Sequence, residues 1–196
     1  MSAKSSLDHK PLEIRWHGRG GQGAITAAKI IAQAAYVKGF KGVTAAPSFG
    51  AERRGAPVSA STRISSEPVL VVSQVEHPSI VVVLDHTLLK YPDVIQGLGK
   101  NCWLVVNSPL TPRELGLKGD FSIATADATK VCQELELMVA GLVIVNTAIL
   151  GALVRATKIV DMQTLEQVIR ERFSRSTVDI NLAAIHKTYE ITKLAK

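Results

Sequence analysis

A glycine-dense turn, Gly-Arg-Gly-Gly-Gln-Gly at residues 18–23, separates a short run of strand-like residues from a long alanine-rich stretch. Residues 14–17 predict a β-strand, and the alanine-rich residues 24–37 predict an α-helix. Because glycine has no Cβ atom, the backbone of such a turn can approach a ligand closely. The free N–H groups at the start of the helix and the positive end of its dipole would then face that ligand. The turn therefore predicts a strand–turn–helix unit that binds an anionic group.

The spacing of the glycines in this turn also matches the G-x-G-x-x-G pattern of dinucleotide sites. Such sites carry an acidic residue about 20 residues further on, at the end of the second strand, where it binds the ribose hydroxyls. Here the second predicted strand, residues 42–46, is followed by Pro47, and the first carboxylate after the turn is Glu52. The missing acid disfavours an NAD or FAD site, which stays an alternative. No Gly-Lys-Ser/Thr sequence closes the turn, so a P-loop NTPase is disfavoured as well.

Strands and helices alternate along the rest of the chain. Residues 58–64 alternate apolar with polar side chains, and a Ser-Ser-Glu-Pro turn leads to residues 69–73, so a local antiparallel hairpin is expected. The valine-rich residues 80–84 predict a central strand covered on both faces, and residues 101–106 and 122–124 continue the pattern. We therefore predict an α/β fold: a single Rossmann-like domain with a mostly parallel sheet, helices on both of its faces, a local β-hairpin and C-terminal helices.

The C-terminal third predicts two amphipathic helices. Each has one apolar stripe with helical spacing, formed by Met162, Leu165, Ile169 and Phe173 in the first and by Val178, Leu182, Ile185 and Tyr189 in the second. Asp161 precedes the first helix and is expected to cap it. We interpret both stripes as core or subunit contacts rather than as a cofactor site.

Residues 137–154 form an uncharged run of 18 residues. Its length only just reaches what a membrane-spanning helix needs, and glycine, asparagine and threonine interrupt it. A buried strand or helix at residues 142–145, followed by a helix capped by Asn146, explains the run better. The run is also apolar enough to pack against another subunit.

Composition limits the remaining classes of function. The chain has 196 residues and 46% apolar residues, enough for one domain at residues 13–196 behind a flexible tail at residues 1–12. The net charge of +6 favours anionic ligands in general, but no basic run interleaved with aromatic residues indicates nucleic acid. The two cysteines, Cys102 and Cys132, are expected to be buried thiols in the reducing cytoplasm. They cannot ligate an ordinary iron–sulfur cluster, which takes four.

A second glycine-punctuated loop follows the second predicted strand. It runs from Ser48 to Pro57 and carries Arg53 and Arg54 between two glycines and two prolines. Loops that are constrained in this way and carry arginines are more often binding surfaces than tolerant connectors. Because ligands of parallel sheets collect at the carboxyl ends of the strands, this loop, the glycine turn and Asp85-His86 are expected to lie on one rim.

Together the glycine turn and the sequence Pro-Ser-Phe-Gly-Ala-Glu-Arg-Arg-Gly-Ala-Pro-Val at residues 47–58 resemble the gamma subunit of pyruvate and related 2-oxoacid:ferredoxin oxidoreductases. The resemblance runs from about Glu13 to the final helix. It implies a subunit of a complex that decarboxylates a 2-oxoacid on thiamine diphosphate with Mg²⁺, passes electrons through iron–sulfur clusters to ferredoxin or another acceptor, and transfers the acyl group to coenzyme A. It further implies alpha, beta and ferredoxin-like delta subunits as partners, which hold those cofactors.

No catalytic residue is expected on this chain, and no cofactor is expected to bind it alone. Our hypothesis is that Arg19 and the N–H groups of Gly20, Gly21, Gln22 and Gly23 hold an anionic group such as a coenzyme A phosphate. Ser48, Arg53 and Arg54 would add to that pocket, or the arginines would bridge to alpha or beta instead. His17, beside the turn, either orients a ligand or is satisfied by the backbone. The alternatives are an independent NAD- or FAD-binding oxidoreductase, an indolepyruvate oxidoreductase beta-type chain, and a purely structural subunit.

Overall fold

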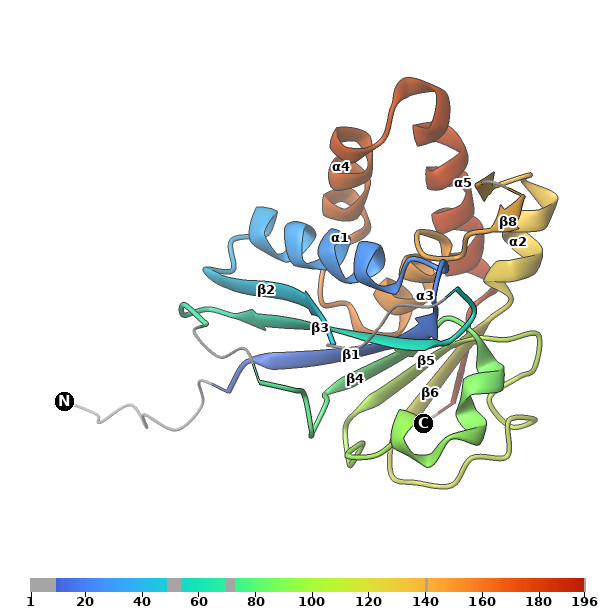
Figure 1. Cartoon of the computed structure of the whole chain (residues 1–196). Helices are drawn as coiled ribbons and strands as arrows, with labels where there is room; N and C mark the ends of the chain where they lie inside the picture. The colour runs from blue at the N-terminus through green and yellow to red at the C-terminus, as the bar shows by residue number, and fades with distance from the viewer. Residues whose placement is uncertain (1–9, 49–53, 70–72, 140, 196) are drawn as a thin grey trace.

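The structure, a computed structural model, describes residues 10–48, 54–69, 73–139 and 141–195. Within these residues the main sheet has the strand order β2-β3-β1-β4-β5-β6-β9, and β7 pairs with β8 separately (Figure 1). The strands are β1 (Leu12–Arg19), β2 (Gly42–Pro47), β3 (Pro57–Ser65), β4 (Ile80–Val83), β5 (Trp103–Asn107), β6 (Ser122–Ala126), β7 (Met138–Val139), β8 (Leu142–Val143) and β9 (Lys193–Ala195). The helices are α1 (Ala24–Val37), α2 (Ala128–Glu134), α3 (Ala148–Thr157), α4 (Met162–Arg172) and α5 (Arg175–Ile191), with 3₁₀ helices η1 (His86–Lys90) and η2 (Pro92–Val94).

The sheet is mostly parallel, as predicted. Neighbouring strands β1, β4, β5 and β6 pair in parallel, whereas β3 is inserted antiparallel between β1 and β2, and β9 closes the other edge antiparallel to β6. The insertion makes β2 run in the same direction as β1. The carboxyl ends of β1, β2 and β4 therefore share one rim with the amino end of β3, and this rim carries both predicted binding loops.

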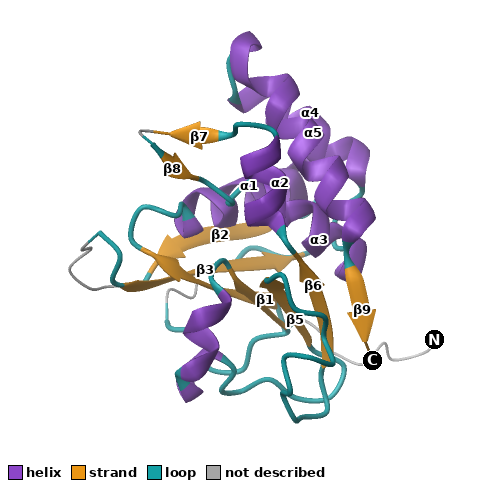
Figure 2. Cartoon of the chain, turned by 90° about the vertical axis from the view of Figure 1, so that its right-hand side faces the viewer, coloured by secondary structure: helices purple, strands orange, loops and turns teal. Residues whose placement is uncertain are grey.

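The α-helices pack on one face of the sheet rather than on both, which corrects the prediction (Figures 1 and 2). Helix α1 lies against β1 to β3 through small side chains, since Ala27, Ala28, Ala34 and Ala35 are fully inaccessible to solvent. On the other face, η1, η2 and the loops up to residue 121 cover β4 and β5. The connections at residues 84–102 and 108–121 contain several prolines and glycines, which interrupt helices.

The predicted hairpin of residues 58–64 with residues 69–73 is wrong. Strand β3 pairs along one edge with β1 and along the other with β2, so neither edge is left for a further strand. Residues 70–72 of the expected partner lie outside the described residues. The local antiparallel hairpin is formed instead by β3 and the strand before it, β2, and the other partner, β1, is more distant in sequence.

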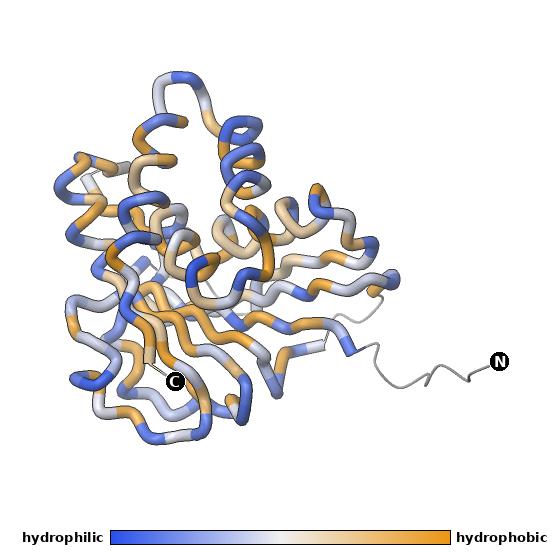
Figure 3. Tube along the Cα trace, turned by 180° about the vertical axis from the view of Figure 1, so that it is seen from behind, coloured by the Kyte–Doolittle hydropathy of each residue, from blue (hydrophilic) through white to orange (hydrophobic). Residues whose placement is uncertain are grey.

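The C-terminal helices follow the prediction closely. Both apolar stripes face the core, with Leu165, Ile169 and Ile185 fully buried, and the Asp161 carboxylate accepts a hydrogen bond from the Thr164 N–H at 2.8 Å. Figure 3 shows hydrophobic segments along the central strands and hydrophilic ones mainly in loops and outer helical turns. In the described part of the chain, no helix is long and apolar enough to cross a membrane.

The uncharged run at residues 137–154 is mostly core. Helix α3 crosses α5 so closely that a Cβ atom on Gly151 would lie 2.1 Å from the Ile185 carbonyl oxygen. Two details differ from the prediction: Leu142, in the short β7–β8 pair, is 40% exposed rather than buried, and α3 begins after Thr147. Asn146 does not cap this helix as predicted, since the residue at the cap position is Thr147; the Asn146 side chain accepts a hydrogen bond from the Thr147 N–H at 2.8 Å.

Candidate functional site

The glycine turn is a closed loop between β1 and α1. The Gln22 N–H donates to the Arg19 carbonyl at 2.9 Å, and the Gln22 side-chain oxygen accepts from the Arg19 N–H at 2.7 Å. Gly21 and Gly23 have φ angles of +95° and +80°, which side chains rarely adopt. Gln22, a predicted ligand, thus uses its side chain to close the turn.

The second loop docks onto this turn through its backbone. The Gly20 N–H donates to the Ala56 carbonyl at 2.8 Å, and the Gly55 N–H donates to the Gly20 carbonyl at 3.1 Å. Two of the four predicted N–H groups, those of Gly20 and Gln22, are therefore occupied. The N–H groups of Gly21 and Gly23 donate to no acceptor within the described residues.

These glycines line a cavity of about 200 Å³ at the start of α1, the glycine-turn cavity, together with Arg19, Pro47 and Ser59. Helix α1 has 14 residues, so its dipole adds positive potential at this end. Unpaired N–H groups at a helix start are the usual means of binding such an anion.

The Arg19 guanidinium is bound by groups just after β4 and in the second loop. Its Nε donates to the Asp85 carboxylate at 2.5 Å, and its terminal nitrogens donate to the Gly55 carbonyl at 3.1 Å and the Thr87 hydroxyl at 2.8 Å. Burial acts to raise the pKa of Asp85, but hydrogen bonds from Thr87 and Arg19 outweigh it and leave that pKa below its ordinary 3.8. Arg19 is thus ion-paired at neutral pH and ties three segments together.

The remaining predicted ligands, Arg54, Ser48 and Arg53, do not gather at the glycine-turn cavity in the described part of the chain. Arg54 is exposed beside Gly20, and its side chain has no hydrogen-bond partner in the described part of the chain. Ser48 lies on the far side of Pro47, where its N–H donates to the Ser59 carbonyl at 2.9 Å. Arg53 lies outside the described residues.

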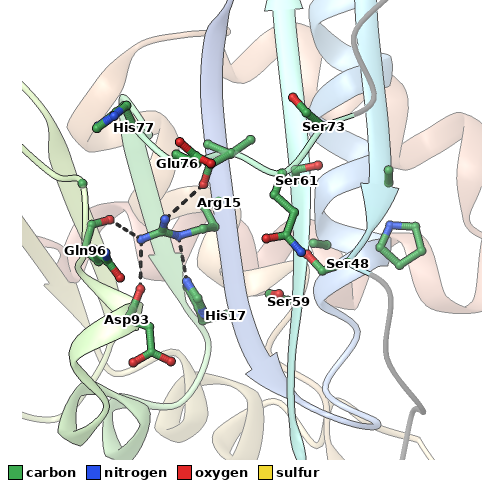
Figure 4. A pocket seen from close by; sticks show the side chains of 16 residues that line it. Arg15, His17, Ser48, Ser59, Ser61, Ser73, Glu76, His77, Asp93 and Gln96 are labelled. Carbon is green, nitrogen blue, oxygen red and sulfur yellow. Dashed lines mark hydrogen bonds between the residues drawn. The ribbon is translucent and has the colours of Figure 1, made fainter.

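A second cavity, of about 570 Å³, lies on the sheet face opposite α1 (Figure 4). We call it the open-face cavity. It is lined by Arg15 and His17 of β1, Ser59 and Ser61 of β3, Ser48 just after β2, and Asp93 of η2. The prediction did not include it. The sequence gives one signal for it, the polar residues Ser59 and Ser61 in the alternating pattern at residues 58–64. That pattern does not show which residues of other elements face these serines, so the cavity was not predicted.

His17 lies on the polar face of β1, opposite Ser59 of β3, and is uncharged at neutral pH. Burial, and then the neighbouring Arg15 guanidinium, lower its pKa to about 4. The Arg15 Nε donates to the His17 Nε2 at 3.1 Å, so this histidine is held by a side chain rather than by the backbone.

The lowered pKa of His17 predicts a pH-dependent stability. Between pH 6.5 and about 4 the unfolded chain binds a proton on this histidine and the folded chain does not, so stability falls as the pH falls. His17 alone should remove roughly 3 kcal/mol of the free energy of unfolding across this window. Urea unfolding at several pH values should show that the free energy of unfolding falls less steeply with falling pH in His17→Asn than in the wild type. The exposed His77, changed to Asn, serves as a control, and equal pH slopes in wild type and His17→Asn would contradict the prediction.

The cysteines lie away from both cavities. Cys132 is buried, and burial raises the pKa of its thiol to about 12, whereas Cys102 is only half-buried, which partly corrects the expectation. Among the residues that the structure describes, no three His, Cys, Asp or Glu side chains gather to hold a metal ion.

Comparison with known proteins identifies close relatives. The sequence model of the family described as pyruvate ferredoxin/flavodoxin oxidoreductase matches residues 13–191. The common gamma subunit of the pyruvate and ketoisovalerate oxidoreductases of Pyrococcus furiosus is 43% identical over 186 residues, covering 93% of this chain and 98% of that one. The crystal structure of the pyruvate oxidoreductase subunit PORC from Thermotoga maritima has a TM-score of 0.83 at 38% identity, covering 95% and 99%.

A third match shows the fold alone. The 2-oxoglutarate:ferredoxin oxidoreductase of Magnetococcus marinus, solved with 2-oxoglutarate, coenzyme A and succinyl-CoA bound, has a TM-score of 0.72 at 22% identity. The match covers 94% of this chain and 31% of that one, so the same fold occurs as one part of a longer polypeptide.

Proposed function

Because this chain belongs to the pyruvate ferredoxin/flavodoxin oxidoreductase family, as a gamma-type subunit, we propose that it serves in a complex that oxidatively decarboxylates a 2-oxoacid. The substrate is pyruvate or a related acid, aryl 2-oxoacids included. The products are CO₂, acyl-CoA and an acceptor, such as ferredoxin, reduced by two electrons. Thiamine diphosphate with Mg²⁺ supplies the decarboxylation chemistry and iron–sulfur clusters carry the electrons, and both belong to the alpha, beta and delta partners in the cytoplasm.

Within that complex, this chain holds an anionic part of coenzyme A at the glycine-turn cavity. The observation that carries the proposal is the pair of unpaired N–H groups, on Gly21 and Gly23, at the start of α1. Arg54 adds a solvent-exposed cation at the same rim. The end of β2 carries Pro47 and Ser48, with no carboxylate for ribose hydroxyls, which favours coenzyme A over NAD or FAD.

The experiment is steady-state kinetics of the purified complex with varied coenzyme A. We expect Arg54→Glu to raise the KM for coenzyme A about tenfold with a smaller effect on kcat, because it removes one charge-assisted contact and repels the phosphate. Arg172→Glu, equally exposed but at the end of α4, is the matched control. An unchanged KM in an intact complex would refute the role of Arg54 at the coenzyme A site. Loss of the partner chains during purification would instead assign Arg54 to a subunit interface.

A further inference from the structure

The β7–β8 hairpin is the part of the uncharged run that lies outside the core. Figures 1 and 2 show it apart from the main sheet, on the side of the helices. The residues that flank it, Leu137 and Val145, are buried and anchor its base, whereas Met138 is 50% exposed and Leu142 is 40% exposed. Met138 pairs with Val143, so Leu142, the neighbour of Val143 in β8, points to the other face. The hairpin therefore exposes apolar side chains on both of its faces.

The composition of this hairpin is that of a protein contact. Single exposed apolar residues are ordinary on a protein surface, but a contiguous group of them marks an interaction site. Four neighbouring apolar side chains are exposed or half-buried here, and we call them the hairpin patch: Met138, Leu142, Val143 and Ile144. No charged residue occurs between residues 137 and 154. The centres of protein–protein interfaces are likewise depleted in charge and enriched in methionine, so the patch suits a protein partner.

The hairpin patch lies beside the rim that carries the glycine turn. Asn146, three residues beyond the last residue of β8, packs against that turn, since a Cβ atom on Gly23 would lie 2.4 Å from the Asn146 side-chain nitrogen. Three residues span at most about 11 Å, so Val143 lies no further than this from Asn146. Leu110, three residues beyond the carboxyl end of β5, is an exposed apolar side chain on the same rim. A body that covers the rim would therefore also reach the patch.

The chemistry of the proposed function requires such a body at this rim. This chain holds coenzyme A there, while the acyl group that coenzyme A receives is held by the partner with thiamine diphosphate. Reacting atoms must come within about 3.5 Å of each other, so that partner must lie against the rim. A second copy of this chain brings no thiamine site, and two copies with a net charge of +6 each repel one another. A stable interface buries about 1,200–2,000 Å² in total, more than four side chains supply, so the patch needs the adjoining rim to complete it.

We propose that the hairpin patch docks this chain onto the partner subunit that holds thiamine diphosphate. The inference rests on the proposed function, which places coenzyme A at the adjoining rim. The surface that receives the patch is apolar and uncharged, because a charge buried against these side chains would have no partner in the hairpin. The buried residues at the base of the hairpin hold the patch in position, and the exposed ones supply the contact.

The first test measures the dissociation constant between the purified chain and the purified remainder of the complex. We expect Met138→Ser/Leu142→Ser to raise this constant about 10- to 100-fold, because it removes two apolar anchors from the interface. The matched control is Tyr36→Ser/Val37→Ser, which changes two comparably exposed apolar residues at the far end of α1, roughly 20 Å from the rim. Both double variants should unfold at the wild-type urea concentration, and only the hairpin variant should bind more weakly. An unchanged dissociation constant in the hairpin variant overturns the inference.

The second test identifies the partner directly. A benzophenone-bearing amino acid in place of Leu142, irradiated in the purified complex, should crosslink to the chain that binds thiamine diphosphate, as mass spectrometry of the crosslinked peptides would show. A crosslink to a second copy of this chain or to the iron–sulfur subunit, or no crosslink at all, is the contrary result.

These outcomes are independent of the test of the proposed function. Neither measurement uses coenzyme A, so both can fail while Arg54→Glu still raises the KM for coenzyme A. Conversely, an unchanged KM in Arg54→Glu refutes the coenzyme A role without changing a dissociation constant. At saturating concentrations of the hairpin variant, the reassembled complex should have the wild-type KM for coenzyme A. A raised KM there would mean that the patch contacts the ligand, and the inference would be wrong.

Discussion

Gly23→Ala is expected to lower the free energy of unfolding by about 3 kcal/mol and to weaken coenzyme A binding in the complex. The φ angle of Gly23 is +80°, where any side chain adds strain of about 1–2 kcal/mol. A Cβ atom there would also lie 2.4 Å from the Asn146 side-chain nitrogen, and Asn146 is buried and anchored to the Thr147 N–H. The turn must therefore shift, and with it the N–H groups of Gly21 and Gly23, which we propose bind the anion. Urea unfolding of the purified chain measures the first effect and the KM for coenzyme A the second.

Gly39→Ala is the matched control for this variant. Gly39 follows the other end of α1 with a φ angle of +103°, but a Cβ atom there meets nothing within 4 Å. Gly39→Ala should lower the free energy of unfolding only by the backbone strain at positive φ, about 1 kcal/mol, and should leave the KM for coenzyme A unchanged. Adding Asn146→Ala to Gly23→Ala should recover part of the loss, because it removes the overlapping atoms. Equal stability losses in the two glycine variants would show that the contact with Asn146 is unimportant.

The order of strands and helices could be predicted because it depends on local patterns. The glycine turn, the alanine-rich α1 and the cap at Asp161 each act within a few residues of their own position. The pairing of β3 depends instead on which strands compete for its two edges, and the preceding strand β2 and the more distant β1 occupy them in place of residues 69–73. For the same reason β9, whose only signal is three residues at the C-terminal end, was not predicted.

The position of the candidate site could be predicted, but the state of its side chains could not. The rim follows from the direction of parallel strands, so the glycine turn and the second loop were expected to meet, and they do. Which acceptor each hydrogen-bond donor of the turn binds depends on residues that are distant in the sequence. Asp85, 66 residues away along the chain, pairs with Arg19, and Ala56 takes the Gly20 N–H. Strand direction predicts that Asp85 lies on the same rim as the turn, but a single sequence does not show that Arg19 is its partner or that Ala56 accepts from Gly20.

The Arg19–Asp85 pair gives the second large effect. We expect Arg19→Glu to raise the KM for coenzyme A by about 10- to 100-fold, because it removes three hydrogen bonds that hold Gly55 and Thr87 beside the turn. It also places a second carboxylate next to Asp85, so the two side chains repel each other. Kinetics of the intact complex with varied coenzyme A measure the change. Arg170→Glu, on the exposed surface of α4, is the charge-matched control.

Asp85→Ala decides how Arg19 acts. If Arg19 contacts the coenzyme A phosphate directly, releasing it from Asp85 should leave the KM unchanged or lower it, since the guanidinium becomes available to the ligand. If Arg19 instead positions the second loop, losing Asp85 should raise the KM several-fold in the same direction as Arg19→Glu. We expect the rise, because the guanidinium spends its donors on Asp85, Gly55 and Thr87 in the structure. The KM for coenzyme A of Arg19→Lys, which keeps the charge but not the forked geometry, should then lie between those of the wild type and Arg19→Glu.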